Sequence, residues 1–543
     1  MSVAALEHGH DLLVVADRIH TCAAAGTVDA LLIRGGRIAA AGAFDELHAA
    51  AAGARTLDLR GSTITPGLTD AHAHLTEWAF ARREADLSAA RSPADAALQV
   101  ATAQGNPAAA RGSRSATGTG PWVRGRGWNP HLWDTAPHRS LLDEHFPDRP
   151  VALQSHDMHA LWVNSAALRV TGIDRGTPHP EGGTIVRDEH GEATGLLLEW
   201  AGRLVTDRIE PPGLADAVAA VRYAQTELHA LGITGIHSFP GIHLIEPDPL
   251  HVLTSLRDRD GLRLRILQHM ALDQLDAAIS AGARSGAGDE WIRTGAVKMF
   301  LDGALGSRTA WMREPYEGSS GCGMRTMEPD EFAHIVRRAS SHGIASTVHA
   351  IGDAAVSLAL DVLGDPAVRV SAMPHRIEHL QCCPVERLGD AVAAGIICSM
   401  QPAHLMTDWS IADRHWGERR ARGTYAFGSL LRCGTILAFG SDVPVEPVDP
   451  RRGLAAAVKR QDTSGAPSAG WYPSERIAPM DALRAYTIGP ARAAGLAAPA
   501  GSLAAGALAD FAAWDHDPCA DLDMIMDMRC TATVVAGVLV HEC

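Results

Sequence analysis

The stretch Ile64-Thr65-Pro66-Gly67-Leu68-Thr69-Asp70-Ala71-His72-Ala73-His74-Leu75 places two histidines two residues apart at the end of an apolar run. Alternate side chains of a β-strand point to the same face, so His72 and His74 could bind one cation together. Pro66-Gly67 cannot continue a helix and predicts a tight turn into this segment. Since a His-x-His pair alone is more often a packed polar pair, metal binding depends on what other segments add.

The composition is that of an ordinary soluble globular protein. The chain has 543 residues, of which 46% are hydrophobic and 20% charged, enough for a large core and roughly two to four domains. A formal net charge of −15 argues against nucleic acid as a partner, because such proteins carry a basic face.

Cellular location is predicted from the cysteines and from the apolar runs. The nine cysteines are odd in number and lack paired spacing, which fits a reducing compartment. Residues 1–18 do not read as a secretory signal, and no apolar run reaches the roughly 18 residues that span a bilayer. We therefore expect a cytoplasmic protein without a membrane partner.

Both ends of the chain carry short strand-like runs separated by turn residues, which predicts a small antiparallel sheet at each end. We expect residues 1–66 and 491–543 to come together as one small β domain. The runs are residues 12–16, 30–33, 37–41 and 63–65 at the start, and 509–513 and 531–541 at the end.

The middle, residues 67–490, alternates apolar strand-like runs with helical patterns, the rhythm of β/α units around a parallel sheet. Nearly every run contains or meets a polar residue. In a (β/α)8 barrel the active site is built from the C-terminal ends of the strands, so this recurrence predicts a barrel enzyme. The clearest runs are residues 235–238, 264–269, 296–301, 345–349, 376–379, 396–400 and 436–440.

Residues 88–201 interrupt this rhythm and predict an insert over the barrel mouth. Residues 107–120, rich in Ala, Gly, Ser and Thr, are expected to be a surface connection, and residues 187–192 a hairpin turn. Trp128, Trp162 and His159 could contact substrate; the tryptophans could equally fill a satellite core.

Further candidate ligands stand at the predicted strand ends: Lys298, His349, His379 and Asp442. Together with His72 and His74 they could surround one or two divalent ions. Imidazole and carboxylate suit zinc, and also manganese, iron or nickel. Burying the charged amine of a lysine in an apolar strand costs free energy, and burial lowers the pKa of that amine. Its neutral amine could add carbon dioxide to form a carbamate that bridges two metals, or Lys298 could pair with Asp302 or another acid.

These residues resemble the amidohydrolase superfamily, specifically its family 3 branch, the YtcJ-like metal-dependent hydrolases. The likeness covers nearly the whole chain. Its motifs are Thr65-Pro66-Gly67-Leu68-Thr69-Asp70-Ala71-His72-Ala73-His74, His159-Ala160-Leu161-Trp162-Val163-Asn164-Ser165, Pro180-Glu181-Gly182-Gly183, Val297-Lys298, Asp302-Gly303-Ala304-Leu305-Gly306-Ser307-Arg308, His349-Ala350-Ile351-Gly352-Asp353, Arg376-Ile377-Glu378-His379, Gln401-Pro402 and Gly440-Ser441-Asp442-Val443-Pro444.

The resemblance implies a (β/α)8 TIM barrel with a β-sandwich built from both termini. It implies that His72 and His74 bind the more buried metal, and that a carboxylated Lys298 bridges to a second metal held by His349 and His379. Asp442 would ligate the first metal and act as the catalytic proton shuttle. The metal is expected to be zinc, and the site could hold one ion or two.

The expected reaction is hydrolysis of an amide-like C–N bond in a small molecule. A bound divalent ion lowers the pKa of water from about 15.7 toward 7, so metal-bound hydroxide would attack the carbonyl while Asp442 moves the proton to the departing nitrogen. An N-substituted formamide, an N-acyl amine or amino acid and a cyclic amide are all candidates. The alternatives are a heterocycle deaminase, which typically needs an extra glutamate, and a non-catalytic barrel scaffold.

Three carboxylates beside the ligands could orient the imidazoles: Asp302, Asp353 and Glu378, with Asp302 ranked first. Each could instead cap a helix or pair with Arg308 or Arg376. The tryptophan-rich insert favours an aromatic or apolar substituent on the substrate. A homodimer is the default expectation for the assembly.

Overall fold

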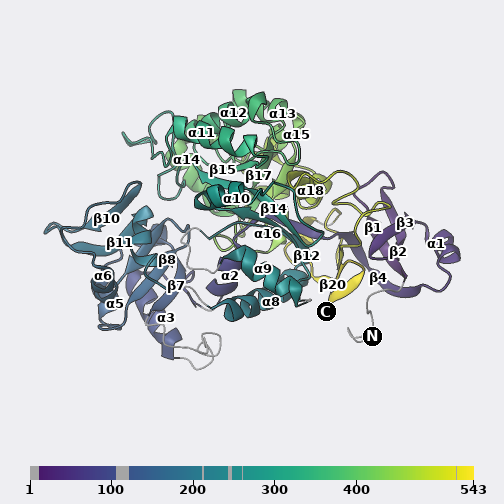
Figure 1. The fold of residues 1–543 in the computed structure, drawn as a ribbon, viewed down its shortest axis with the longest axis horizontal. Coiled ribbons are helices and arrows are strands. Elements are labelled where there is room, and N and C mark those ends of the chain that lie inside the picture. The colour runs from purple at the N-terminus through teal and green to yellow at the C-terminus, as the bar shows by residue number, and fades with distance from the viewer. Residues whose placement is uncertain are drawn as a thin grey trace.

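The computed structural model describes residues 11–82, 84–105, 122–210, 213–241, 248–259, 261–520 and 522–543. The surface connection predicted at residues 107–120 lies outside these ranges. The described chain contains three sheets, with a barrel between an insert (blue, left) and a sheet that joins the two chain ends (purple and yellow, right) (Figure 1). No helix in the described ranges has both the length and the apolar run needed to cross a bilayer.

The barrel is an eight-stranded parallel sheet, as the sequence predicted. Its first and last strands meet at their C-terminal ends, where the Asp442 N–H donates to the His72 carbonyl at 2.7 Å and the His74 N–H donates to the Val443 carbonyl at 2.8 Å. In order, the strands are β5 (Leu68–Ala73), β12 (Ile233–Ser238), β13 (Arg265–Met270), β14 (Ile292–Phe300), β15 (Ser346–Ala350), β16 (Arg376–His379), β17 (Ile397–Met400) and β18 (Leu437–Phe439).

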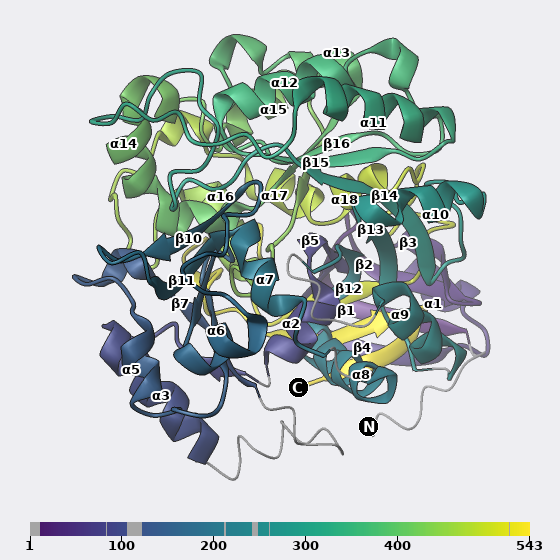
Figure 2. The same ribbon diagram turned by 60° about the vertical axis from the view of Figure 1, so that its left-hand side comes forward.

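Helices cover the outside of the barrel (Figure 2). In α11 (Pro329–Ser341), the buried residues Phe332, Val336 and Ala339 recur at helical spacing, and Pro329 begins the helix where its missing N–H costs nothing. The others are α8 (Leu214–Ala230), α9 (Pro249–Asp258), α10 (Leu275–Ser280), α12 (Asp353–Leu363), α13 (Asp390–Ala394), α14 (Leu405–Ala421), α15 (Phe427–Arg432), α16 (Pro450–Lys459), α17 (Pro479–Ala485) and α18 (Ile488–Ala493).

The two ends of the chain share one seven-stranded sheet with a common core, in the order β21-β20-β19-β4-β1-β2-β3. The expectation of purely antiparallel pairing is wrong at one place: β1 and β4 run parallel, because α1 (Phe44–Ala50) lies between β3 and β4 in the chain. The strands are β1 (Leu12–His20), β2 (Thr27–Arg34), β3 (Arg37–Gly42), β4 (Arg55–Pro66), β19 (Phe511–Trp514), β20 (Cys530–Val535) and β21 (Val538–Glu542).

The predicted tight turn at Pro66-Gly67 does not form. Strand β4 ends at Pro66 and β5 begins at Leu68, so the chain passes from the terminal sheet into the barrel with one residue between. Glycine is needed there because a Cβ would lie 2.2 Å from the Thr234 hydroxyl. Gly67 therefore allows the chain to pass close to Thr234 of β12.

The insert is built on a six-stranded sheet, and the predicted hairpin joins its last two strands. Trp128, Trp133 and Trp162 pack together in its core, with the Trp128 and Trp133 rings stacked at 5.4 Å. The strands are β6 (Ala85–Asp86), β7 (Val123–Trp128), β8 (Val151–Ser155), β9 (Ala160–Val163), β10 (Gly183–Arg187) and β11 (Ala193–Glu199). The helices of this part of the chain are α2 (Leu75–Ala81), α3 (Pro93–Gly105), α5 (Arg139–Asp143), α6 (Ser165–Thr171) and α7 (Arg203–Thr206).

Candidate active site

The six predicted ligands line one cavity at the C-terminal end of the barrel. Strand β5 carries His72, and His74 follows as the N-cap of α2. Asp442 follows β18, where its left-handed backbone (φ 62°) turns the chain. The remaining three ligands stand on the consecutive strands β14, β15 and β16: Lys298, His349 and His379.

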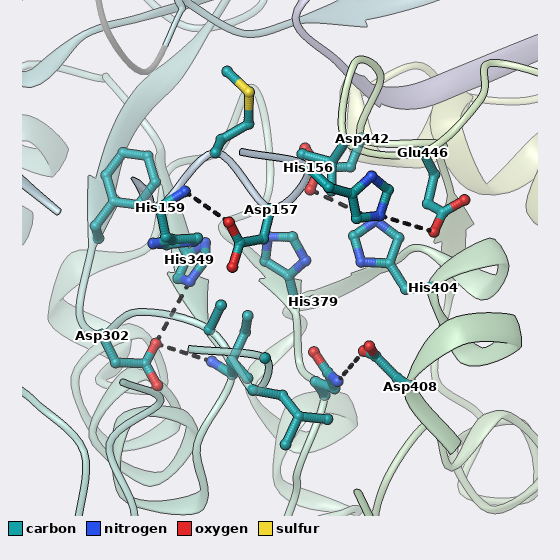
Figure 3. Close-up of a pocket in the computed structure, with 18 of the residues that line it drawn as sticks. His156, Asp157, His159, Asp302, His349, His379, His404, Asp408, Asp442 and Glu446 are labelled. Carbon is teal, nitrogen blue, oxygen red and sulfur yellow. Dashed lines mark hydrogen bonds and ion pairs between the residues drawn. The ribbon is translucent and has the colours of Figure 1, made fainter. Parts of the chain in front are cut away.

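Asp442 lies at the centre of the donor atoms. Its Oδ1 is 3.3 Å from His72 Nε2 and 3.5 Å from His74 Nε2. The donor atoms of His72, His379 and Asp442 all lie within 4.8 Å of one another. The rings of His349 and His379 are 4.5 Å apart and point into the cavity (Figure 3). Residues up to 370 positions apart therefore meet in one place, as the barrel hypothesis requires.

Three of the imidazoles are oriented through the nitrogen that faces away from the centre. His72 Nδ1 lies 2.7 Å from the Glu378 carboxylate, and His74 Nδ1 donates to the Pro240 carbonyl at 2.7 Å. His349 uses Nε2, at 3.0 Å from the Gly303 carbonyl. Burial lowers the pKa of His72 to about 4, so its ring is neutral at pH 7. A neutral ring held this way offers a lone pair to a metal.

Lys298 is buried between aromatic rings. Its Nζ lies 4.9 Å from the Phe239 ring centre and 4.7 Å from that of Phe300. Among the described residues, no carboxylate oxygen comes within 4.0 Å of this amine. The Asp302 carboxylate instead accepts backbone N–H groups, including that of Gly352 at 2.7 Å. Burial lowers the pKa of Lys298 to about 8, which leaves part of the amine neutral at pH 7.

The carboxylates beside the ligands do not share one role. Glu378 contacts His72 directly and also binds the fully buried Arg376. Asp302 Oδ1 is 3.7 Å from His349 Nε2, beyond hydrogen-bonding distance. Asp353 begins α12 and accepts the Arg313 N–H, away from every ligand, and Arg308 is an exposed side chain. The structure thus places Glu378, ranked below Asp302, closest to a ligand.

The insert contributes His159 and Trp200 to the cavity, whereas the two tryptophans predicted to contact substrate lie outside it. Trp128 and Trp162 are fully buried in the insert core. Of the two roles predicted for these tryptophans, they therefore fill a satellite core and do not contact substrate. His159 Nδ1 lies 2.7 Å from the Glu199 carboxylate. Burial would lower the pKa of His159, but Glu199 raises it to about 9, so the ring is a cation at neutral pH.

Several cavity residues were not predicted. His404 Nε2 lies 3.7 Å from Asp442 Oδ2 and has no hydrogen-bond partner in the described part of the chain. His156 of the insert faces Glu446 of the barrel at 3.7 Å (Figure 3). His404 could have been predicted from its position just after β17, because the other candidate ligands also stand at or just after strand ends. Other side chains that line the cavity are Asp157, Glu199, Asp408, Met158, Trp200, Phe300, Leu305, Ile351, Ile411 and Val445.

Comparison with known proteins identifies the family. The model of the Amidohydrolase family matches residues 55–541. The chain is 30% identical to the putative amidohydrolase YtcJ of Bacillus subtilis, over 95% of this chain and 96% of that protein. It is also 30% identical to an N-substituted formamide deformylase of Arthrobacter pascens, over 98% of both chains. An uncharacterized metal-dependent hydrolase from Pyrococcus horikoshii superposes with a TM-score of 0.75 at 26% identity, covering 94% of this chain and 99% of that one. The chain therefore belongs to the amidohydrolase family, as an enzyme that hydrolyses carbon–nitrogen bonds other than peptide bonds.

Proposed function

We propose that this enzyme hydrolyses the C–N bond of an N-substituted formamide or a related N-acyl amine whose nitrogen carries an apolar substituent. The observation that carries the proposal is the position of Asp442. Its carboxylate stands within 3.5 Å of the Nε2 atoms of His72 and His74, and all three side chains line the cavity.

The donor set fits a divalent ion, zinc first. We propose that His72, His74 and Asp442 hold one ion, and that His349 and His379 hold a second with a carbamate on Lys298. The fit is supported by the partly neutral amine of Lys298 and by the unpartnered Nε2 of His404 facing Asp442. A divalent ion bound there would polarise a carbonyl oxygen and lower the pKa of a water molecule.

Asp442 is suited to move the proton. Burial would raise the pKa of its carboxyl, but His72, His74 and His379 hold it well below the usual range. The carboxylate is therefore ionised at neutral pH and can accept the proton of the attacking water. It can then return that proton to the departing nitrogen, which makes an amine an acceptable leaving group. The cationic His159, which also lines the cavity, would donate a hydrogen bond to the substrate.

The lining of the cavity supports an apolar substituent. Met158, Trp200, Phe300 and several aliphatic side chains line the cavity and form its apolar surface. The tryptophans of the insert core do not contribute to this surface. The formamide deformylase relative supports a small acyl group on the nitrogen. We expect turnover to fall as the substituent becomes smaller and more polar, because less apolar surface is removed from water.

The test compares Asp442→Asn with wild type on N-substituted formamides, N-acyl amino acids, cyclic amides and amino-substituted heterocycles. Loss of the proton acceptor should lower kcat by about 10²–10⁴-fold, with the bound metal, measured by mass spectrometry, largely retained. Asp353→Asn is the matched control, because that buried carboxylate lies outside the cavity. Unchanged activity in Asp442→Asn would refute the role of Asp442, and ammonia release from heterocycles alone would favour a deaminase.

A further inference from the structure

A second group of metal-binding side chains lies far from the barrel mouth, where the two ends of the chain meet. His20 ends β1, and Asp517 and Cys519 follow β19. One donor atom from each of these residues lies within 4.8 Å of the other two. His20 Nε2 is 2.9 Å from Asp517 Oδ1, across a sequence separation of 497 residues. Among the described residues, this is the one such group that combines nitrogen, oxygen and sulfur donors.

A second thiol, that of Cys22, lies near Cys519. Cys22 lies close enough to Cys519 for the charge of one thiolate to disfavour that of the other. The Cys22 Sγ is 4.0 Å from the Met480 Sδ of α17, so the barrel also reaches this corner. Cys22 has a backbone φ of 52°, which residues other than glycine rarely adopt. All nine cysteines, which lie in the described ranges, are free thiols.

The contacts around the group orient its donors as the neighbours of a metal site do. Arg18 donates to Asp517 Oδ2 at 2.6 Å, which leaves Oδ1 turned toward His20. The Thr27 hydroxyl lies 3.5 Å from His20 Nδ1, the nitrogen that points away from the group. His20 is 7% exposed and the Asp517 side chain 11%, so the group is shielded and still close to the surface.

We infer that His20, Asp517 and Cys519 form a zinc site that links the start of the chain to its end. Imidazole, carboxylate and thiolate are all zinc ligands. Binding must release the proton of the Cys519 thiol, so affinity should increase with pH. This holds for any site with a thiolate ligand. This inference does not depend on the function proposed for the barrel.

Cobalt substitution separates this site from the barrel site. A thiolate bound to Co²⁺ gives a near-ultraviolet charge-transfer band, and the barrel cavity is lined by no cysteine among the described residues. Metal-free full-length protein titrated with Co²⁺ should show the band in wild type and in His72→Ala. Cys519→Ser and His20→Gln should lose it together with about one equivalent of bound metal. Cys433→Ser, at an exposed cysteine, is the matched control.

Two results would overturn the inference: the absence of the band in wild-type protein, or a band that persists in both Cys519→Ser and His20→Gln. The wild-type spectrum decides the question even where a variant fails to fold. As a second readout, Zn²⁺ should raise the Tm of a protein that carries His72→Ala and His379→Ala, and leave the Tm unchanged when Cys519→Ser is added, because binding stabilises the folded state only where the site exists.

Discussion

At the scale of single residues, Glu378 connects the metal ligands to the barrel interior. It stands on β16 between Arg376 and His379, and its carboxylate accepts from Arg376 and meets His72 Nδ1 at 2.7 Å. Burial would raise the pKa of Glu378, but Arg376 and His72 hold it well below the usual range. A permanent carboxylate there keeps the proton of His72 on Nδ1 and leaves Nε2 free for the cation.

Glu378→Gln should therefore weaken metal binding. The neutral amide orients the His72 ring less strongly, and we expect affinity to fall by about 10–100-fold, measured by competition with a chromophoric chelator. Glu475→Gln is the matched control, because Glu475 is also buried and hydrogen-bonded to Ser429 but lies outside the cavity. Equal metal affinity in Glu378→Gln and wild type would contradict the orienting role.

The sequence predicted which candidate ligands meet in the cavity better than it predicted their neighbours. His72 lies near the end of β5, and His74 and Asp442 follow β5 and β18, so topology alone brings them to one end of the barrel. The contact between His156 and Glu446 depends on how the insert docks on the barrel, and no spacing in the sequence reports that. The tryptophans were ambiguous for a similar reason, because an aromatic residue serves a core and a substrate pocket equally well.

At the scale of elements, the closure of the barrel depends on how closely β18 approaches β5. At Gly440 a Cβ would lie 2.4 Å from the His72 backbone nitrogen and 2.7 Å from Asp70 Oδ1. Asp70 in turn accepts from the Ser441 hydroxyl at 2.5 Å, which fixes the loop that carries Asp442. Packing between two strands therefore sets the distance between His72 and Asp442.

Gly440→Ala should separate these strands. We expect a loss of about 1–3 kcal/mol in the free energy of unfolding, typical of overpacking, measured in urea, together with weaker metal binding. Gly389→Ala is the control, since a Cβ there meets no atom within 4 Å and the backbone φ of −77° is ordinary. Wild-type stability in Gly440→Ala would show that the strands can shift without cost.

Helix α8 carries a histidine that couples the terminal sheet to pH. His229 is 3% exposed, its Nε2 donates to the Arg263 carbonyl, and its own carbonyl accepts from Thr533 of β20. Burial lowers its pKa from 6.5 to about 4. The unfolded chain therefore binds more protons between these values, and stability falls as pH decreases through this range.

His229→Gln should remove this part of the pH dependence. Between pH 7 and pH 5 the wild type should lose about 2 kcal/mol more stability than the variant, measured by urea unfolding at both pH values. His334→Gln, on the outer helix α11, provides the comparison with a histidine that is not buried. Parallel losses in wild type and His229→Gln would exclude His229 as the titrating group.

The elements themselves were largely predictable. Seven barrel strands overlap their predicted runs, because buried parallel strands read as continuous apolar segments. Their bounds agree within two residues except in β14, which begins four residues earlier than predicted. The parallel pairing of β1 with β4 and the missing turn at Gly67 were not predictable. Strand direction and the need for glycine beside Thr234 are decided by segments far away in the chain.

At the scale of the whole molecule, the cavity is a point where many strands meet. The donor residues come from β5, β14, β15, β16 and the loop after β18, so both halves of the barrel contribute. A cation shared among them would add a further link between these segments. The insert and the terminal sheet lie on opposite sides of this barrel (Figure 1).

Removal of the metal should therefore destabilise the whole barrel. A chelator should abolish activity and lower Tm, since a ligand at 100 times its Kd contributes about 2.7 kcal/mol; Zn²⁺ or Mn²⁺ should restore both. In a variant that combines His72→Ala, His379→Ala and Cys519→Ser, which lacks a ligand at every proposed metal position, the chelator should leave Tm unchanged. A chelated wild type that keeps its Tm and its activity would show that the imidazoles around Asp442 are a packed polar cluster and not a metal centre.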